Sequence, residues 1–451
     1  MKLLRRFVFV LLAVVGLLAL FIAANLIPVD ETPYAQTDFY RQTIDRLASL
    51  PMPAPAKQGL RAGWAKVNMT PNFTTPTGGY GVRRGKHWST VHDSIYARAT
   101  VVDNGSVRVA LVALDLLIVP PTVVEALKRR LPEVGFTWEQ VYMGAIHSHN
   151  SLGGWAPGLV GTLIAGSYEE RIVTLITESV LNAIRAANRD LQPVSVAYTE
   201  TAAPEMVYNR LHNEGPEDDR VRVLQLRQPG GKTATIASFA AHSTIINSDV
   251  PQWLSRDWPG VLVDNLEKQT GNFAMYMAGA VGSMGPTEKG ETEDAQLHFI
   301  ADSLTTKIST ALAQAPARPD SALALLTLPL TLRDAHVRVS DGWRLRPWLF
   351  LKLYGDYPAE MKALRIGPTV LLGMPADFSG ELAMQLGKTV AGRGLNLMVT
   401  SFNGGYIGYV TPDAYYHETR YETRDMNWFG PQMGAYFTEL GGRMVQKVAQ
   451  P

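Results

Sequence analysis

The sequence predicts an α/β protein, with a mixed β-sheet core flanked by helices in a single large domain behind an N-terminal transmembrane helix. Short apolar runs bounded by turn residues alternate with longer segments whose apolar residues recur at helical spacing. The chain of 451 residues is long enough to bury a large core. Residues 7–24 form an apolar stretch without a charge, preceded by Lys2, Arg5 and Arg6.

The N-terminal stretch determines where the protein is expected to reside. Eighteen helical residues span about 27 Å, enough to cross the hydrocarbon core of a bilayer. The alternative, a cleaved signal peptide, usually has a shorter apolar region and a small-residue cleavage site, which Ala23-Ala24 matches poorly. We therefore expect a single-pass signal anchor at residues 7–27 of the cell (inner) membrane. Residues 1–6 would be cytoplasmic and the rest extracytoplasmic, on the periplasmic side.

Composition excludes several function classes. The net charge is +1 and there is no long basic block, so nucleic-acid binding has no electrostatic basis. The chain has no cysteine, which excludes disulfides, a thiolate nucleophile and cysteine-ligated metal. Any metal site must use histidine, carboxylate, tyrosine or backbone oxygen ligands. No sequence feature indicates the oligomeric state.

Two regions follow the apolar stretch. Residues 28–58 are expected to hold a juxtamembrane helix that begins after Thr37 and a stiff, Pro-rich linker at residues 51–55. Residues 59–451 are expected to form one large catalytic domain. Its long Gly- and Arg-rich loop at residues 70–88 is of a kind that is often functional.

Strands and helices alternate within this domain. Strands are expected at residues 63–68, 97–102, 107–119, 141–146, 195–199, 221–226, 233–241, 273–279, 323–332, 369–374 and 395–401. Helices are expected at residues 120–131, 168–188, 294–313, 378–390 and 430–448, and from about residue 258. Asn104-Gly105 is expected to turn a hairpin between the second and third strands.

The functional interpretation begins at His147-Ser-His149, which lies between an apolar run and a Gly-rich turn. On an extended backbone, positions i and i+2 point to one face, so both imidazoles are expected at the end of a strand. Such a pair is a common way to offer neutral nitrogen ligands to zinc. Taken alone, the pair is also compatible with histidines that only make hydrogen bonds within a loop.

Two further polar residues follow apolar strands. They are His242 and Asp377, and a glycine-aromatic run at residues 403–409 follows another strand. Residues that converge at one sheet edge would give a His, His, Asp zinc set with an open position for water. Each also has a structural alternative: His242 would be a hydrogen-bonded loop residue, and Asp377 the N-cap of a helix that begins at Phe378.

This ordered set of motifs resembles the neutral (non-lysosomal, alkaline) ceramidases and their bacterial relatives, a family of zinc amidases. The resemblance covers most of residues 60–440. It rests on Gly63-Trp-Ala-Lys-Val-Asn-Met-Thr-Pro71, His92-Asp-Ser-Ile-Tyr-Ala-Arg98-Ala, His147-Ser-His149-Asn-Ser-Leu-Gly-Gly, Tyr208-Asn209-Arg210, His242-Ser-Thr, Asp257-Trp-Pro-Gly260, and Tyr409-Val-Thr-Pro-Asp-Ala-Tyr with Tyr421-Glu422. The ordered set is far more specific than any one of its members.

The resemblance implies a function and a set of site residues. Zinc-activated water would cleave the amide of ceramide or a related N-acyl lipid. The implied zinc ligands are His147, His242, Asp377 and Tyr409. The implied catalytic residues are His149, which would be free of the metal and act as the base, and Arg210 and Tyr421, which would stabilise the oxyanion. The implied substrate-binding residues are Asp257, Ser283 and Gly285.

Three departures from the family pattern keep other functions open. Asp377 stands where the family has a longer Glu, and Gly285 stands where it has a Ser, with Ser283 two residues away. The chain ends at Pro451, whereas the larger members continue into a C-terminal β-sandwich. The alternatives are a degenerate member that binds a lipid or a protein partner, and a zinc hydrolase of another ester or amide. The apolar residues 343–354 would be a membrane-facing or acyl-binding element, or a buried helix.

Overall fold

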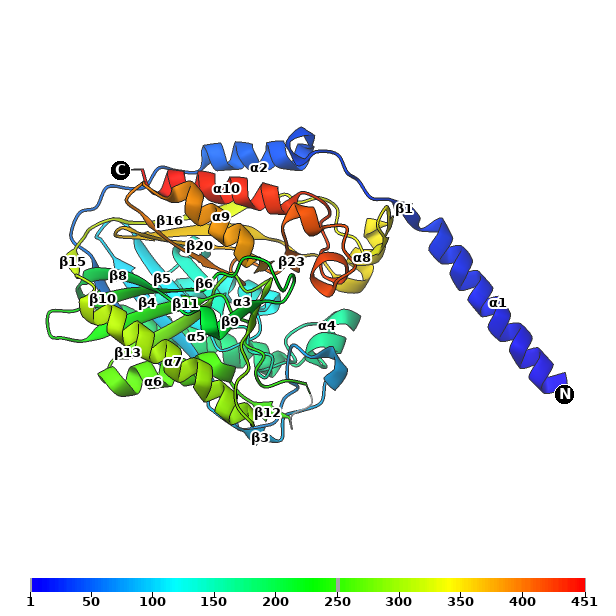
Figure 1. The fold of residues 1–451 in the computed structure, drawn as a ribbon, viewed down its shortest axis with the longest axis horizontal. Helices are drawn as coiled ribbons and strands as arrows, with labels where there is room; N and C mark the ends of the chain where they lie inside the picture. Colours follow the sequence, from blue (N-terminus) through cyan, green and yellow to red (C-terminus); the bar gives the residue numbers. More distant parts are fainter. Residues whose placement is uncertain (1, 249–251, 451) are drawn as a thin grey trace.

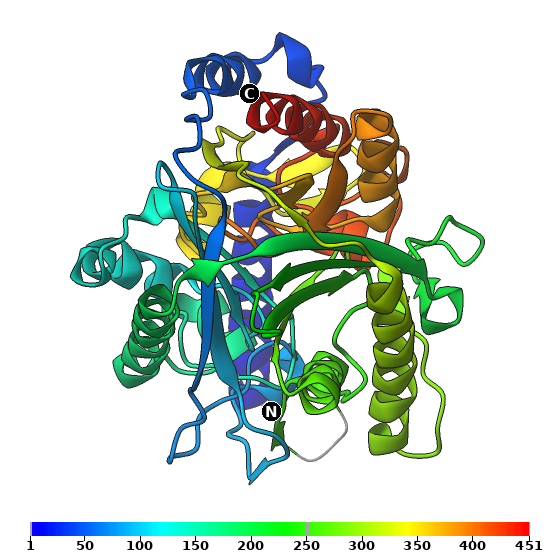
Figure 2. The ribbon, with the colours of Figure 1, turned by 90° about the vertical axis from the view of Figure 1, so that its left-hand side faces the viewer.

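The computed structural model describes residues 2–248 and 252–450, and its body consists of three main sheets with helices on their outer sides (Figures 1 and 2). This arrangement confirms the predicted α/β class. Met1 and Pro451, the outermost residues of the predicted regions, lie outside the described residues.

The first sheet has the strand order β6-β5-β4-β2-β7. Its strands are β2 (Arg61–Asn68), β4 (Tyr96–Asp103), β5 (Arg108–Leu114), β6 (Val141–Ala145) and β7 (Gln192–Pro193). The predicted hairpin joins β4 to β5, and Gly105 in its turn has φ +80°. The parallel pair β5–β6 is connected through α3 (Pro121–Arg130), and α5 (Glu170–Arg189) covers β2 and β4.

The second sheet has the order β13-β11-β10-β8-β15. Its strands are β8 (Ser195–Ala202), β10 (Arg220–Arg227), β11 (Thr233–Phe239), β13 (Phe273–Ala278) and β15 (Arg318–Pro319). Here β11 and β13 are the parallel pair. They are connected through α6 (Asp257–Thr270), which packs on β13 and on α7 (Glu293–Gln314).

The third sheet has the order β16-β19-β20-β22. Its strands are β16 (Leu323–Pro329), β19 (Glu360–Ile366), β20 (Thr369–Gly373) and β22 (Asn396–Thr400). The parallel pair β20–β22 is connected through α9 (Gly380–Val390). Two further helices, α10 (Met433–Val448) and α2 (Asp38–Ser49), also pack on this sheet. β19 was not predicted, because charged residues interrupt its apolar run. One of them, Lys362, is buried and donates to the Val141 carbonyl of the first sheet at 2.7 Å.

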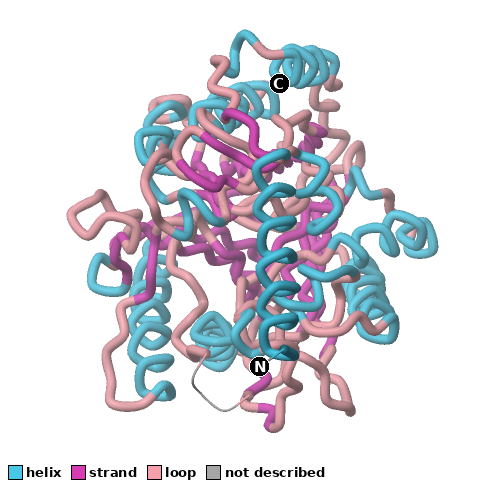
Figure 3. Tube along the Cα trace, turned by 90° about the vertical axis from the view of Figure 1, so that its right-hand side faces the viewer, coloured by secondary structure: helices cyan, strands magenta, loops and turns pink. Residues whose placement is uncertain are grey.

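The three sheets enclose a common apolar core. This core contains Leu111 of the first sheet, Leu224 of the second and Leu371 of the third. Two polar links also join the sheets: the Ser401 amide donates to the Ala278 carbonyl at 2.9 Å, and Tyr142 and Thr400 share a hydrogen bond of 2.6 Å. Figure 3 shows the strands in the interior with helices around them.

Short elements surround the ends of these sheets. They are β1 (Leu26–Pro28), β3 (Thr90–Val91), β9 (Val207–Asn209), β12 (Trp253–Leu254), β14 (Met284–Pro286), β17 (Arg338–Ser340), β18 (Trp343–Leu345), β21 (Asp377–Phe378), β23 (Tyr409–Val410), α4 (Gly158–Ala165), α8 (Pro347–Tyr354), the 3-10 helices η1 (Tyr34–Gln36), η2 (Gly81–Arg83), η3 (Leu131–Val134), η4 (Trp138–Gln140), η5 (Pro204–Met206) and η6 (Asp413–Tyr415), and the short π-helix η7 (Tyr421–Asp425). α4 was not predicted. Residues 347–354 form the helix α8, in which only Phe350 is buried, with its ring stacked on that of Tyr354 at 4.4 Å, so the interpretation of residues 343–354 as a buried helix holds for Phe350 alone.

The N-terminal helix α1 (Lys2–Ala24) stands away from the body (Figure 1). Its segment Leu3–Ala24 is long and apolar enough to cross a membrane, and none of it is buried against the protein. The chain then forms β1, which pairs with β18 in a small sheet.

Candidate metal centre and active site

Three loops, one from each main sheet, meet at a single point. His147 follows β6, His242 follows β11 and Asp377 follows β20, and each of these strands belongs to the parallel pair of its sheet. Polar groups that follow parallel strands gather at the edge where the carboxyl ends of those strands lie. Here three such edges coincide, and all three side chains are buried.

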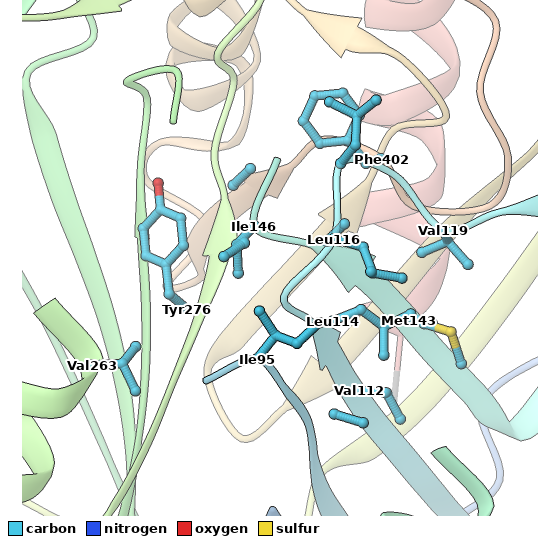
Figure 4. Close-up of a cluster of buried hydrophobic side chains, with 14 of the residues drawn as sticks. Ile95, Val112, Leu114, Leu116, Val119, Met143, Ile146, Val263, Tyr276 and Phe402 are labelled. Atoms are coloured by element: carbon cyan, nitrogen blue, oxygen red, sulfur yellow. The ribbon is translucent and has the colours of Figure 1, made fainter. Parts of the chain in front are cut away.

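The chain turns sharply at His147. The strand ends at Ala145 and His147 has φ +67°, so the two histidines lie just past the end of a strand, as expected, but not on the extended backbone that was assumed for them. They still meet, with the Nε2 atoms of His147 and His149 3.2 Å apart. The ring of Phe402 stacks on that of His147 at 3.9 Å, and Figure 4 shows Phe402 above the buried side chains of Leu116 and Ile146. This packing holds the strained turn in place.

Backbone carbonyls fix the protonation of two imidazoles. Nδ1 of His147 lies 2.8 Å from the Leu117 carbonyl, and Nδ1 of His242 lies 2.8 Å from the Val281 carbonyl. Because each Nδ1 donates its proton to a carbonyl, each Nε2 turns a lone pair into the site, as a metal ligand must. Burial lowers the pKa of His147 to about 3 and that of His242 well below its usual value, so both are neutral at pH 7.

One oxygen of Asp377 points at the same place. Its Oδ2 accepts a hydrogen bond from the Tyr406 hydroxyl at 2.8 Å. Its Oδ1 lies 3.5 Å from Nε2 of His147 and 3.3 Å from Nε2 of His242, and it has no hydrogen-bond partner among the described residues. Asp377 lies in β21, and α9 begins only at Gly380, so the interpretation of Asp377 as a helix N-cap is wrong.

Tyr409 is brought beside Asp377 by strand pairing. The two residues are partners in the parallel pair of β21 and β23, and the Tyr409 hydroxyl lies 3.3 Å from Nε2 of His242. Ligands on a tetrahedral zinc ion with bonds of about 2.1 Å are separated by about 3.4 Å. The three separations of 3.3–3.5 Å among these groups match this value. With the unpartnered Oδ1 of Asp377, they fit a four-coordinate metal ion.

His149 lies within reach of the same point. The ligand atoms of His147, His149 and His242 all lie within 4.8 Å of one another. The ring of His149 packs on Tyr80 at 4.8 Å, its buried Nδ1 has no partner among the described residues, and burial lowers its pKa. The geometry therefore allows His149 to be a ligand or a neutral base beside the metal.

Arg210 and Tyr421 border this group. Arg210 donates through Nη2 to the Tyr409 hydroxyl at 2.9 Å, and its Nε lies 3.3 Å from a carboxylate oxygen of Glu422. Burial alone would lower the pKa of Arg210, but Tyr409 and Glu422 keep it raised, so the guanidinium stays charged. The Tyr421 ring meets Tyr409 edge-on at 5.8 Å and is 54% exposed, so the site reaches the surface at Tyr421, and we call this point its mouth.

Comparison with known proteins identifies the family. Residues 61–295 match the family described as "Neutral/alkaline non-lysosomal ceramidase, N-terminal", and this range is more than half of the chain. The chain belongs to this ceramidase family. Family membership supports a hydrolase that acts on an amide.

Two solved ceramidase structures share the fold. A neutral ceramidase from Pseudomonas aeruginosa aligns with a TM-score of 0.77 at 19% identity, covering 88% of this chain and 75% of that one. A structure described as ceramidase complexed with C2 aligns with a TM-score of 0.75 at 18% identity, covering 88% of this chain and 76% of that one.

In this fold, Ser283 is hydrogen-bonded to the backbone of Arg210. Its hydroxyl accepts from the Gly380 amide at 3.1 Å and donates to Glu381, while its carbonyl accepts from the Arg210 amide at 2.8 Å. Ser283 therefore holds the backbone of Arg210, and its hydroxyl is already used in bonds within the protein. Gly285 pairs with Tyr208 across β14 and β9, and a Cβ at Gly285 would come within 2.6 Å of the Tyr208 ring. The tyrosine ring thus lies where a serine side chain would start.

Asp257 supports the loop that follows His242. Its carboxylate accepts from the backbone amides of Ile246 at 2.9 Å, Trp258 at 2.8 Å and Ile245 at 3.3 Å. These bonds hold the backbone and leave the carboxylate facing the loop. The structure therefore shows Asp257 bonded to this loop, and its contact with the substrate stays a prediction.

Sequence reasoning missed three residues that contact the site: Tyr406, Tyr80 and Phe402. Tyr406 lies in the glycine-aromatic run at residues 403–409 and Tyr80 in the Gly- and Arg-rich loop at residues 70–88, and these compositions were the available signal. Nothing in the sequence marks Phe402, because its role depends on φ +59° and on stacking against a residue from another sheet.

Proposed function

We propose that this ceramidase-family protein is a zinc-dependent hydrolase that cleaves the amide of ceramide or a related N-acyl lipid. The observation that carries the proposal is the buried set of His147, His242, Asp377 and Tyr409. Oδ1 of Asp377 has no hydrogen-bond partner among the described residues and lies 3.5 Å and 3.3 Å from the Nε2 atoms of the two histidines, and the Tyr409 hydroxyl lies 3.3 Å from Nε2 of His242. We further propose that α1 is a signal anchor that holds the domain at the extracytoplasmic side of the membrane.

Residues of the chain would carry most of the mechanism. Zinc, when bound, supplies Lewis acidity and makes water more acidic. His149 accepts a proton from the attacking water and returns it to the leaving amine, which needs an imidazole that is neutral at the start. Partial burial of Tyr421, together with the nearby charge of Asp377, raises its pKa to about 12, so its hydroxyl remains a donor. Tyr421 and the charged Arg210 then stabilise the oxyanion that forms at the amide carbon.

The first experiment measures zinc in the purified full-length protein by elemental analysis. We expect close to one zinc per chain in the wild type. His147→Ala should lose the metal, whereas His149→Ala should keep it and lose most turnover on ceramide. Loss of the metal from both variants would make His149 a ligand and overturn its role as the base. A folded wild type that takes up no zinc would contradict the proposal as a whole.

The second candidate is a zinc hydrolase for a different amide or ester. The Tyr208 ring at Gly285 favours it, because this ring changes the wall where the family pattern has a serine. A panel of ceramides, N-acyl amino acids and acyl esters separates the two candidates. Turnover confined to the ceramides supports the first candidate, and turnover confined to the other compounds supports the second. A zinc-loaded protein without turnover on the panel would indicate a degenerate, binding member.

A further inference from the structure

The start of the body is attached to α8 where α1 ends. The Arg346 amide donates to the Asn25 carbonyl at 2.9 Å, and the Trp348 indole N–H donates to the Asn25 side chain at 3.2 Å. The Trp348 ring also meets Phe21 of α1 edge-on at 6.4 Å. If α1 crosses the bilayer, α8 lies where the chain leaves it.

Large apolar side chains are exposed on this side of the body. α8 lies close to α4, and α4 contacts η2. Figure 1 shows α4 and α8 on the side of the body from which α1 extends. We call this surface the α4–α8 face, and its exposed apolar residues are Val82, Leu159, Leu163, Trp343, Trp348, Leu351 and Leu353. Soluble proteins rarely leave a group of large apolar side chains exposed unless it contacts another molecule.

The charges within the segments of this face are of one sign, and the exposed Asp341 and Asp356 lie just outside them. The segments 81–88, 157–167 and 343–354 contain no aspartate or glutamate. They carry exposed cations at Arg84, Lys86, Arg346 and Lys352. Exposed tryptophan and leucine surrounded by arginine and lysine is the composition of elements that lie in the interface of a bilayer with anionic lipids. A protein partner would require no such bias and no position beside a membrane anchor.

The face also borders the mouth of the active site. On one side, Tyr80 precedes η2 and packs on His149 at 4.8 Å. On the other side, Arg338 of β17 donates to the Thr423 carbonyl in η7, the short π-helix that begins with Tyr421. A segment of the face, and the strand β17 that pairs with β18 of the face, therefore contact residues on both sides of the site.

We propose that the α4–α8 face docks into the surface of the lipid bilayer and turns the active-site mouth toward it. This inference rests on the proposed function, because it assigns the entry route of a lipid substrate. In this arrangement α1 tethers the domain, and the α4–α8 face orients it. A substrate can then pass from the leaflet into the site without crossing water.

The absence of cysteine permits a direct test. Single cysteines replace Leu159, Leu163 or Leu351 in the full chain, and each is spin-labelled in vesicles of phosphatidylethanolamine and phosphatidylglycerol. The control is Met52→Cys in the linker after α2, since Met52 is 54% exposed and Leu163 is 52% exposed. A label at Leu12 in α1 reports insertion of the anchor. The measurement is collision of each label with oxygen, which concentrates in lipid, and with a polar nickel complex, which is excluded from it.

We expect the labels at Leu159, Leu163 and Leu351 to collide more with oxygen and less with nickel than the label at Met52. If the labels on the α4–α8 face collide with oxygen and nickel as often as the label at Met52 does, the proposal is overturned. The face would then be covered by water or by a protein partner. The Leu12 label and the zinc content are read on the same samples. Failure of docking is thereby distinguished from failure of the anchor or of the metal centre. Exposed positions were chosen so that the cysteines leave the core unchanged, and thermal unfolding of each variant checks this.

Discussion

At the scale of single residues, the carboxylate of Asp377 is held by one hydroxyl. The side chain is one methylene shorter than the glutamate of the family pattern, so its direction decides whether it reaches the proposed metal position. Tyr406 occupies Oδ2 at 2.8 Å and leaves Oδ1 facing His147 and His242. A group that orients a ligand in this way raises metal affinity without touching the metal.

Tyr406→Phe removes this hydroxyl and leaves the ring. We expect zinc affinity to fall by roughly 10–100-fold, the usual effect of losing such a partner. Competition with a chromophoric chelator measures the change. The matched control is Tyr436→Phe, which removes a buried hydroxyl bonded to Thr43 at 2.9 Å and should leave zinc affinity unchanged. Equal affinity in wild type and Tyr406→Phe would show that Asp377 is oriented by other contacts.

At the scale of elements, the site depends on close approach between loops from different sheets. The loop after β13 lies directly against β21, where the Gly282 amide donates to the Phe378 carbonyl at 2.8 Å. A Cβ at Gly282 would lie 2.5 Å from the carbonyl oxygen of Asp377. Backbone atoms on both sides leave no room for adjustment, and the strand that carries Asp377 would have to move.

Gly282→Ala should therefore destabilise the protein by about 1–3 kcal/mol, the usual cost of overpacking, and should weaken zinc retention. Denaturant unfolding and zinc titration provide the two measurements. Gly387→Ala in α9 is the matched control, because no atom lies within 4 Å of its Cβ position. Helix propensity predicts a gain of about 0.5–1 kcal/mol for that variant. A stable Gly282→Ala protein with unchanged zinc affinity would contradict the close-approach argument.

At the scale of the whole molecule, residues 30–40, which follow α1, make polar contacts with the C-terminal part of the chain. Asp30 pairs with Arg333 at 2.7 Å, and the Tyr34 and Tyr40 hydroxyls both donate to Glu439 at 2.7 Å. His336 lies buried nearby, with Arg344 Nη1 3.3 Å from its Nδ1. Burial, together with the surrounding arginines, lowers the pKa of His336 to about 4.

This buried histidine makes stability depend on pH. Because the folded pKa lies below the unfolded value of about 6.5, the unfolded state binds the extra proton between these values, and stability falls as pH decreases. We expect His336 to account for a loss of about 2 kcal/mol between pH 7 and pH 5. Denaturant unfolding at both pH values checks this in wild type and in His336→Gln, which should lose correspondingly less. Identical losses would assign the effect to other groups.

Much of the fold was predictable because it depends on local sequence patterns, namely the spacing of apolar residues and the positions of turn residues. β2, β4, β10 and α5 lie close to where apolar spacing and turn residues had placed them. β5 and β11 end earlier than predicted, at Leu114 and Phe239. Their apolar runs continue past the strands because the following loops are themselves buried. A buried strand and a buried loop give the same kind of apolar run in the sequence, so the end of the strand cannot be read from it.

The sequence by itself determined the α/β class, the apolar N-terminal helix and the residue types available to a metal, since each of these depends on composition or short spacing. Only the tertiary structure decided that His147, His242 and Asp377 come from three different sheets and meet, that His147 adopts a left-handed turn, and that Tyr406 orients Asp377. It also decided that Asp257 supports a loop and that α4 and α8 share one exposed face. Such contacts join residues far apart in the chain, and no local spacing encodes the distance between them.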